Sequence, residues 1–187
     1  ISNIYEYIDP DKVRKSLLEI EKIEPKVLVI KINSRGGTIT ATAFLEKIIN
    51  EFKQKNNISI YFFTTEILAS GGYWVATSGD KIFANYGSII GSIGVSGPSW
   101  YYYDKPVAIS NSIFGQKIET KNGIQIFDQN SGNSKDLYNP FRKPNKEELT
   151  HLQKIISEIY NDFVIKVSKS RKIEISTLKN EIGALIY

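Results

Sequence analysis

The stretch that decides the fold is residues 68–74, L-A-S-G-G-Y-W. It follows an apolar, β-rich run over residues 58–65, which predicts a buried strand. Small residues then form a corner, after which residues 73–76 predict a short buried helix. A serine at a strand-to-helix corner exposes its hydroxyl near backbone N–H groups that lack a helical acceptor. The stretch therefore predicts either a nucleophilic serine, Ser70, or a glycine-rich turn with a solvated serine.

A second glycine corner lies upstream, at residues 33–37, N-S-R-G-G. It follows residues 26–32, an almost continuous apolar run typical of a parallel strand covered on both faces. Residues 40–55 predict an amphipathic helix that leads into the strand at 58–65, which makes a right-handed strand-helix-strand unit. Its expected buried side consists of Phe44, Leu45, Ile48, Ile49 and Phe52. Both glycine corners therefore follow strands, where open α/β sheets place their sites.

The remaining sequence predicts an α/β fold in one domain over residues 1–187. A helix begins at Asp9-Pro10, and residues 81–84 predict another strand. Residues 88–127 predict a less regular β region, with a hairpin signal at Asn122-Gly123. A capping box of Asn145 and Glu148 predicts the start of a long helix, and a short helix is expected near Ser176.

Composition excludes several classes of function. The chain is 41% apolar and 24% charged, as in ordinary globular proteins, and its net charge of +4 forms no basic stripe for nucleic acid. It has no cysteine, which excludes disulfides and thiolate sites, and its one histidine, His151, excludes a multi-histidine metal site. We therefore expect no metal, no other cofactor and no nucleic-acid partner. No apolar run approaches the roughly 18 residues that cross a bilayer, and no signal peptide opens the chain.

A nucleophilic Ser70 needs a general base. His151 falls within the long helix, where a surface or packing role is the simpler interpretation. The usual alternative is a lysine kept neutral by apolar surroundings, because a free lysine has a pKa near 10.4. Lys135 lies in a non-helical segment flanked by apolar side chains and is the first candidate. Lys121, in a turn, is the second.

Acyl transfer at Ser70 also needs donors for the developing oxyanion. The N–H of Gly71, directly after the nucleophile, is one candidate. A second could come from Gly36 or Gly37, where the absence of a Cβ lets a substrate carbonyl approach.

Four segments in this order and spacing resemble the signal peptide peptidase A (SppA-type) family of serine peptidases. They are residues 32–37 (I-N-S-R-G-G), 69–73 (A-S-G-G-Y), 91–95 (G-S-I-G-V) and 132–141 (G-N-S-K-D-L-Y-N-P-F). The resemblance covers roughly residues 26–175. It implies a Clp-protease/crotonase-like fold of strand-helix units, with an irregular β region and a long C-terminal helix.

The resemblance also implies residue roles. Ser70 would be the nucleophile, Lys135 the general base, and Gly36 or Gly37 an oxyanion donor. In single-repeat members the serine and the lysine come from neighbouring protomers of a homo-oligomer. Family substrates are signal peptides or other membrane-protein segments. The family is membrane-anchored by an upstream segment, which would lie outside this chain, with the catalytic part on the extracytoplasmic side.

The chain departs from the family in three ways. Arg35 replaces a proline, the separation between Ser70 and Lys135 is long, and the C-terminal segment that usually completes the domain is missing. Because the chain also begins at Ile1 rather than Met, we expect a fragment or a shortened homologue. Two alternatives to a peptidase remain open at this point. One is an inactive scaffold of the same fold, and the other is a crotonase-like acyl-CoA enzyme, which needs no serine nucleophile.

Overall fold

The computed structural model describes residues 10–104, 110–112, 115–117, 131 and 133–185. Its contacts divide the chain into two compact units. The first unit contains Ile1–Val95 and Ser157–Tyr187, and the second contains Ser96–Ile156. The single domain over residues 1–187 stays a prediction.

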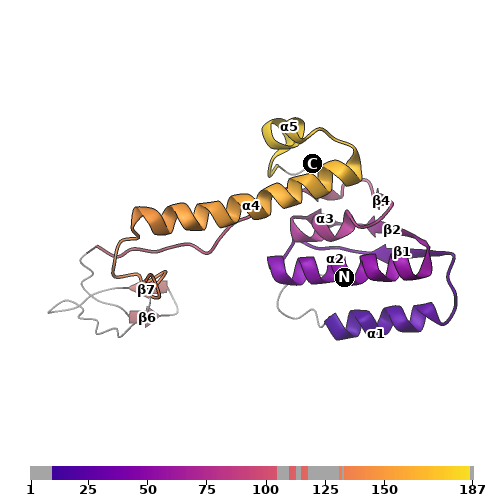
Figure 1. The fold of residues 1–187 in the computed structure, drawn as a ribbon, viewed down its shortest axis with the longest axis horizontal. Helices are drawn as coiled ribbons and strands as arrows, with labels where there is room; N and C mark the ends of the chain where they lie inside the picture. The colour runs from indigo at the N-terminus through magenta and orange to yellow at the C-terminus, as the bar shows by residue number, and fades with distance from the viewer. Residues whose placement is uncertain (1–9, 105–109, 113–114, 118–130, 132, 186–187) are drawn as a thin grey trace. The chain divides into compact units, whose positions relative to one another are not determined.

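A parallel sheet of order β1-β2-β4 forms the centre of the first unit (Figure 1). Its strands are β1 (Val27–Lys31), β2 (Ser59–Thr64) and β4 (Lys81–Ala84), and the last has the bounds predicted from the sequence. Helix α2 (Ile39–Asn56) connects β1 to β2, which confirms the predicted strand-helix-strand unit. Thr38 begins this helix, because its side-chain oxygen accepts the N–H of Ala41 at 3.3 Å.

A second, shorter sheet pairs β3 (Ile67–Ala69) with β5 (Ile89–Gly91) in parallel. An isolated parallel bridge joins Ser34 to Leu68 of β3. Local sequence patterns do not delimit these strands, since each has only three residues and is formed by partners far away in the chain; β5 falls within the β region predicted over residues 88–127. They place Ser70 directly after β3 and beside the first glycine corner.

The core lies between the sheet and the helices. Fully buried side chains come from the residue after β1 (Ile32), from α2 (Leu45, Ile49), from β2 (Ile60, Phe62) and from helix α4, Lys146–Arg171 (Phe163, Val164, Val167). Helix α1 (Pro10–Glu21) packs on α2 through Leu17. Four of the five side chains expected to be buried on α2 are buried, whereas Phe44 is 37% exposed and has Arg14 over its ring.

The opposite face of the sheet is open among the described residues. Val27 and Val29 of β1 are 44% and 59% exposed, and Phe83 of β4 is 48% exposed. The prediction that the first strand is covered on both faces is therefore wrong for this chain. The physical reason is the strand period of two: Leu28 and Ile30 face the helices, and the valines between them face outward.

The C-terminal part contains α4 (Lys146–Arg171), α5 (Ile175–Thr177) and a π-helical turn (Leu178–Ile182). The predicted capping box is confirmed. Asn145 N–H donates to Glu148 Oε2 at 2.9 Å, and Glu148 N–H donates to Asn145 Oδ1 at 2.8 Å.

The second unit holds a small antiparallel pair, β6 (Ser110–Ser112) with β7 (Gly115–Lys117). The predicted hairpin turn at Asn122-Gly123 and the candidate Lys121 lie outside the described residues.

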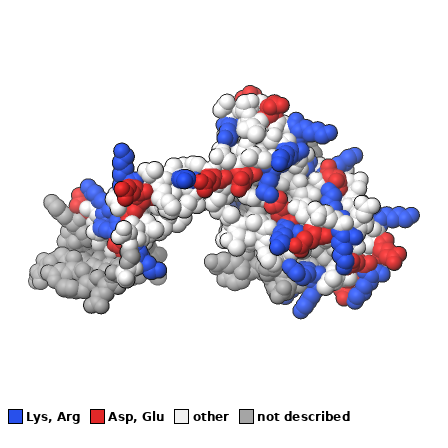
Figure 2. Space-filling view, in the orientation of Figure 1, with Lys and Arg blue, Asp and Glu red and all other residues white. Residues whose placement is uncertain are grey.

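The surface mixes both signs of charge. Figure 2 shows lysine and arginine atoms interspersed with aspartate and glutamate atoms over the first unit. Across the part of the chain that is described, no helix combines the length and the apolarity needed to span a bilayer.

Asn33, just after β1, is hydrogen-bonded to the end of β2, so its removal should destabilise the fold. Its Oδ1 accepts from Thr64 Oγ1 (2.9 Å), Thr65 N–H (2.9 Å) and Glu66 N–H (3.2 Å), and its Nδ2 donates to Thr65 Oγ1 (2.8 Å). We expect Asn33→Ala to lower the free energy of unfolding by about 1–3 kcal/mol, measured by chemical denaturation. The control Asn50→Ala, on the half-buried side of α2, should change it little. Equal values for both variants would contradict this account.

Candidate active site

Ser70 lies at a strained corner between β3 and α3 (Gly71–Ala76). Its φ and ψ are 50° and −126°, a conformation that non-glycine residues rarely adopt. Backbone hydrogen bonds hold it there: Ser70 N–H donates to Gly91 O at 2.9 Å, and Trp74 N–H donates to Ser70 O at 2.9 Å. The Ser70 hydroxyl makes no capping bond to α3. The corner therefore has the form expected for a nucleophile on a strand-to-helix turn.

The structure brings the two glycine corners together. Ser34 N–H donates to Ile67 O at 2.7 Å, and Ala69 N–H donates to Ser34 O at 2.9 Å. Gly36, with a φ of +116°, then lies against the serine: a Cβ added to it would be 2.8 Å from Ser70 Cβ and 3.1 Å from Ser70 Oγ. Only a glycine fits this close approach.

Hydrogen bonding distinguishes Gly36 from Gly37 as a possible oxyanion donor. Gly36 N–H donates to the buried Ser34 Oγ at 3.2 Å, so it already has an acceptor. The N of Gly37 lies 3.3 Å from the position that a Cβ on Gly71 would occupy. Gly37 also takes part in a β-bridge, so its position beside Gly71, and not a free N–H, makes it the candidate that we carry forward.

Helix α3 is a rigid support for Ser70, because all six of its residues are buried. Trp74 Nε1 donates to Glu46 Oε2 of α2 at 2.9 Å, and Lys166 of α4 donates to Glu46 Oε1 at 2.7 Å. The Trp74 ring also stacks on Phe163, with centroids 4.9 Å apart. Burial raises the pKa of the Tyr73 phenol, partly offset by the charge of Arg171. Tyr73 therefore stays neutral at physiological pH.

Lys135 belongs to the second unit, in a turn over residues 133–138, and its side chain is exposed. The apolar surroundings expected for a neutral lysine are therefore not present around it in the described part of one chain. His151 is likewise exposed on α4, as a surface histidine would be.

Arg142 holds the turn that carries Lys135. Its guanidinium donates to Asp136 (Nε to Oδ2 at 2.6 Å and Nη2 to Oδ1 at 2.8 Å) and to Glu148 (Nη2 to Oε1 at 2.6 Å and Nη1 to Oε2 at 2.9 Å). The carboxylate next to Lys135 is therefore engaged by Arg142. Arg142 was not predicted from the sequence. An arginine between two acidic residues near the start of a predicted helix could have indicated this ion-pair cluster.

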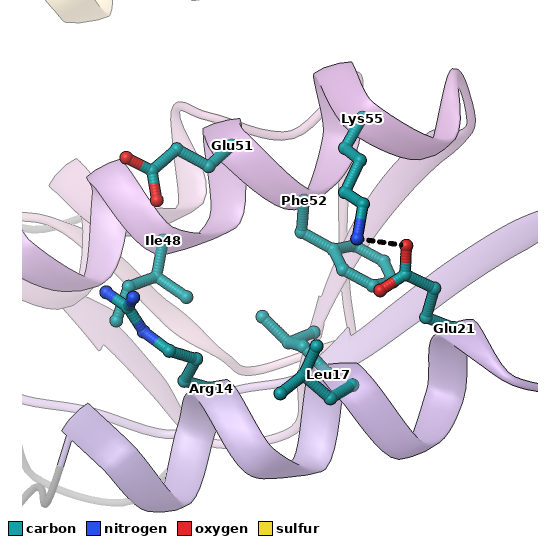
Figure 3. Close-up of a pocket in the computed structure, with 8 residues that line it drawn as sticks. Arg14, Leu17, Glu21, Ile48, Glu51, Phe52 and Lys55 are labelled. Carbon is teal, nitrogen blue, oxygen red and sulfur yellow. Dashed lines mark ion pairs between the residues drawn. The ribbon is translucent and has the colours of Figure 1, made fainter.

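A groove between α1 and α2 lies in the first unit and holds none of the predicted site residues (Figure 3). Leu17, Ile48 and Phe52 form its apolar floor, and Lys55 pairs with Glu21 at its rim at 2.7 Å. The residues that line it include no serine, threonine or cysteine. Nor do three or more His, Cys, Asp or Glu side chains gather as a metal site among the residues described.

Gly36→Ala tests the close approach of the two corners. Both Gly36→Ala and Gly87→Ala place a Cβ on a residue with positive φ, which costs about 1–3 kcal/mol of stability. Only Gly36→Ala adds a clash, because a Cβ on Gly87 meets nothing within 4 Å. We expect Gly36→Ala to unfold at lower denaturant than Gly87→Ala and to lose reactivity at Ser70. Identical unfolding midpoints would refute the close packing.

The Arg142 cluster predicts a pH dependence of stability. The hydrogen bonds from Arg142 lower the pKa of Glu148 from 4.5 to about 2, and they also lower that of Asp136. A lowered folded-state pKa adds stability that is complete above about pH 5 and is lost as pH falls from about 4.5 towards 2. Arg142→Ala should therefore be less stable than the wild type at pH 7. Its melting temperature should also fall less than that of the wild type as the pH is lowered over this range. An unchanged pH profile would contradict the cluster.

Comparisons with known proteins identify the family of the chain. The model of Peptidase family S49 matches residues 52–182, which include Ser70 and Lys135. A candidate protease of Methanocaldococcus jannaschii is 35% identical over 161 residues, covering 86% of this chain and 47% of that protein. A candidate signal peptide peptidase, SppA, of Enterococcus faecium is 31% identical over 175 residues, covering 91% of this chain and 47% of that protein. The chain thus spans less than half the length of these two relatives.

Among solved structures, a ClpP1 mutant from Listeria monocytogenes superposes with a TM-score of 0.59 at 14% identity, covering 97% of this chain and 75% of that chain. This likeness shows the fold alone, and it confirms the predicted Clp-protease-like α/β architecture. The family match covers most of the chain and confirms the resemblance drawn from the sequence segments. The chain belongs to peptidase family S49.

Proposed function

We propose that the protein is a serine endopeptidase with a Ser-Lys dyad, in which Ser70 is the nucleophile and Lys135 the general base. The observation that carries the proposal is the strained Ser70 corner, held by backbone hydrogen bonds against the glycine corner at residues 33–37. A serine that only lined a turn would need neither the strain nor the close approach.

The chemistry follows from the groups at the corner. The neutral amine of Lys135 takes the proton of Ser70 as Oγ attacks the substrate carbonyl carbon. The oxyanion that forms receives hydrogen bonds from the N–H groups of Gly71 and Gly37. Lys135 then gives its proton to the leaving amine, and water hydrolyses the acyl-enzyme by the same steps.

In this proposal, a homo-oligomer provides the apolar surroundings that Lys135 lacks in a single chain. Lys135 is exposed here, whereas a neutral lysine needs apolar surroundings, so we place it in the active site of a neighbouring protomer in a homo-oligomer. Contact with that neighbour would remove water from the amine. The segment of the second unit that carries Lys135 would then complete the site on the first unit of the next copy.

The substrates we propose are signal peptides and other extended, apolar peptides derived from membrane proteins. The name of the Enterococcus faecium relative supports this class. We further propose that the protein associates with the membrane through a segment outside this chain and acts on the extracytoplasmic side. No cofactor takes part in the proposed reaction.

Replacing either dyad residue should abolish turnover without unfolding the protein. In the assembled protein, Ser70→Ala and Lys135→Ala should each lower kcat/KM for an apolar peptide by at least about 10³-fold, with unchanged circular dichroism. Ser70 should be the residue labelled by a fluorophosphonate probe.

The matched controls are Lys143→Ala, another exposed lysine of the second unit, and His151→Ala. Both should keep full activity. Turnover by Ser70→Ala would refute the peptidase assignment. Turnover by Lys135→Ala, together with its loss in Lys121→Ala, would move the base to Lys121. Absence of labelling in the assembled wild type would favour a scaffold.

A further inference from the structure

Thr42 has a buried hydroxyl without a partner. The residue lies in the first turn of α2 and is 2% exposed, and Oγ1 has no donor or acceptor among the residues that the structure describes. Burying an unpaired hydroxyl costs free energy, so it rarely persists without a reason. Thr64 shows the ordinary arrangement: it is equally buried, and its hydroxyl donates to Asn33 Oδ1 at 2.9 Å.

The unpaired hydroxyl lies at the proposed oxyanion hole. A Cβ added to Gly71 would overlap Thr42 Oγ1 and would lie 3.3 Å from Gly37 N. A Cβ added to Gly36 would lie 3.1 Å from both Gly71 N and Ser70 Oγ. The side of Gly71 that lacks a Cβ thus packs against the Thr42 hydroxyl and Gly37 N, and that of Gly36 packs against Ser70 Oγ and Gly71 N.

We propose that the Thr42 hydroxyl is a third donor to the oxyanion, beside the N–H groups of Gly71 and Gly37. This inference rests on the proposed function. As the bond from Ser70 Oγ to the carbonyl carbon forms, the π electron pair of the carbonyl moves onto its oxygen, and the serine proton goes to Lys135. Thr42 O–H then gains the acceptor that it lacks in the resting protein.

This timing makes the hydroxyl suited to catalysis. A hydrogen bond that is absent in the free enzyme and forms on the oxyanion stabilises the transition state more than the ground state. The unpaired hydroxyl lowers the stability of the folded protein when no substrate is bound. Removing it should therefore slow the reaction and stabilise the protein together, which a space-filling threonine would not do.

The test compares Thr42→Val, which keeps the shape, with Thr42→Ser, which keeps the hydroxyl, in the assembled protein. We expect Thr42→Val to lower kcat about 10²-fold with little change in KM, and to weaken binding of a peptide boronic acid by a similar factor. Thr42→Ser should keep most of the activity. The thermal midpoint should rise in Thr42→Val but fall in the control Thr64→Val, which loses a hydrogen bond.

Each other outcome overturns the inference. Wild-type kcat in Thr42→Val, or equal losses in Thr42→Ser and Thr42→Val, would show that the hydroxyl does not act on the oxyanion. A lower thermal midpoint in Thr42→Val would show that the hydroxyl is already paired. If the wild type turns over and Ser70→Ala does not, the proposed function stands whatever Thr42 does. A wild type without turnover would refute both the proposed function and the role of Thr42.

Discussion

The backbone pairing between Ser34 and the short strand β3 is the constraint on which the site depends. Two hydrogen bonds, from Ser34 N–H to Ile67 O and from Ala69 N–H to Ser34 O, link segments that lie over thirty residues apart in the chain. They bring the glycine corner after the first strand against the serine corner after the third. Neither corner alone contains Ser70 together with both of the proposed oxyanion donors, Gly71 and Gly37. The site therefore arises from the sheet topology rather than from one motif.

The surrounding fold stabilises a corner that is locally unfavourable. Ser70 has a positive φ, and Thr42 buries a hydroxyl without a partner, so both residues cost stability. The buried helix α3, with Trp74 held by Glu46 and stacked on Phe163, offsets this cost through packing and hydrogen bonds. Functional sites commonly combine strained residues with rigid neighbours, which impose a conformation that the local sequence does not favour.

Local signals in the sequence predicted much of this structure. The strand at Lys81–Ala84, the helix predicted over residues 40–55 and the Asn145–Glu148 capping box each depend on neighbouring residues, and each is confirmed. The strands β3 and β5 were not delimited because three residues carry no period, and their pairing is long-range. The exposed Val29 was misjudged because an apolar run does not reveal whether a second layer covers it.

The candidate site was predictable to a similar extent. Serine-glycine corners after strands indicated Ser70 and the glycines, but the sequence could not choose between Gly36 and Gly37, since the choice depends on a hydrogen bond to Ser34. Thr42 looked like any polar helical residue.

The central claim concerns the partner of Ser70, and a crystal structure of the assembled protein with a peptide boronic acid tests it most directly. The account predicts boron bonded to Ser70 Oγ, its oxygen within hydrogen-bond distance of the N–H groups of Gly71 and Gly37, and the Lys135 amine of a neighbouring protomer beside that serine. A boronic acid bound away from Ser70, or a Ser70 with no lysine within reach, would contradict it.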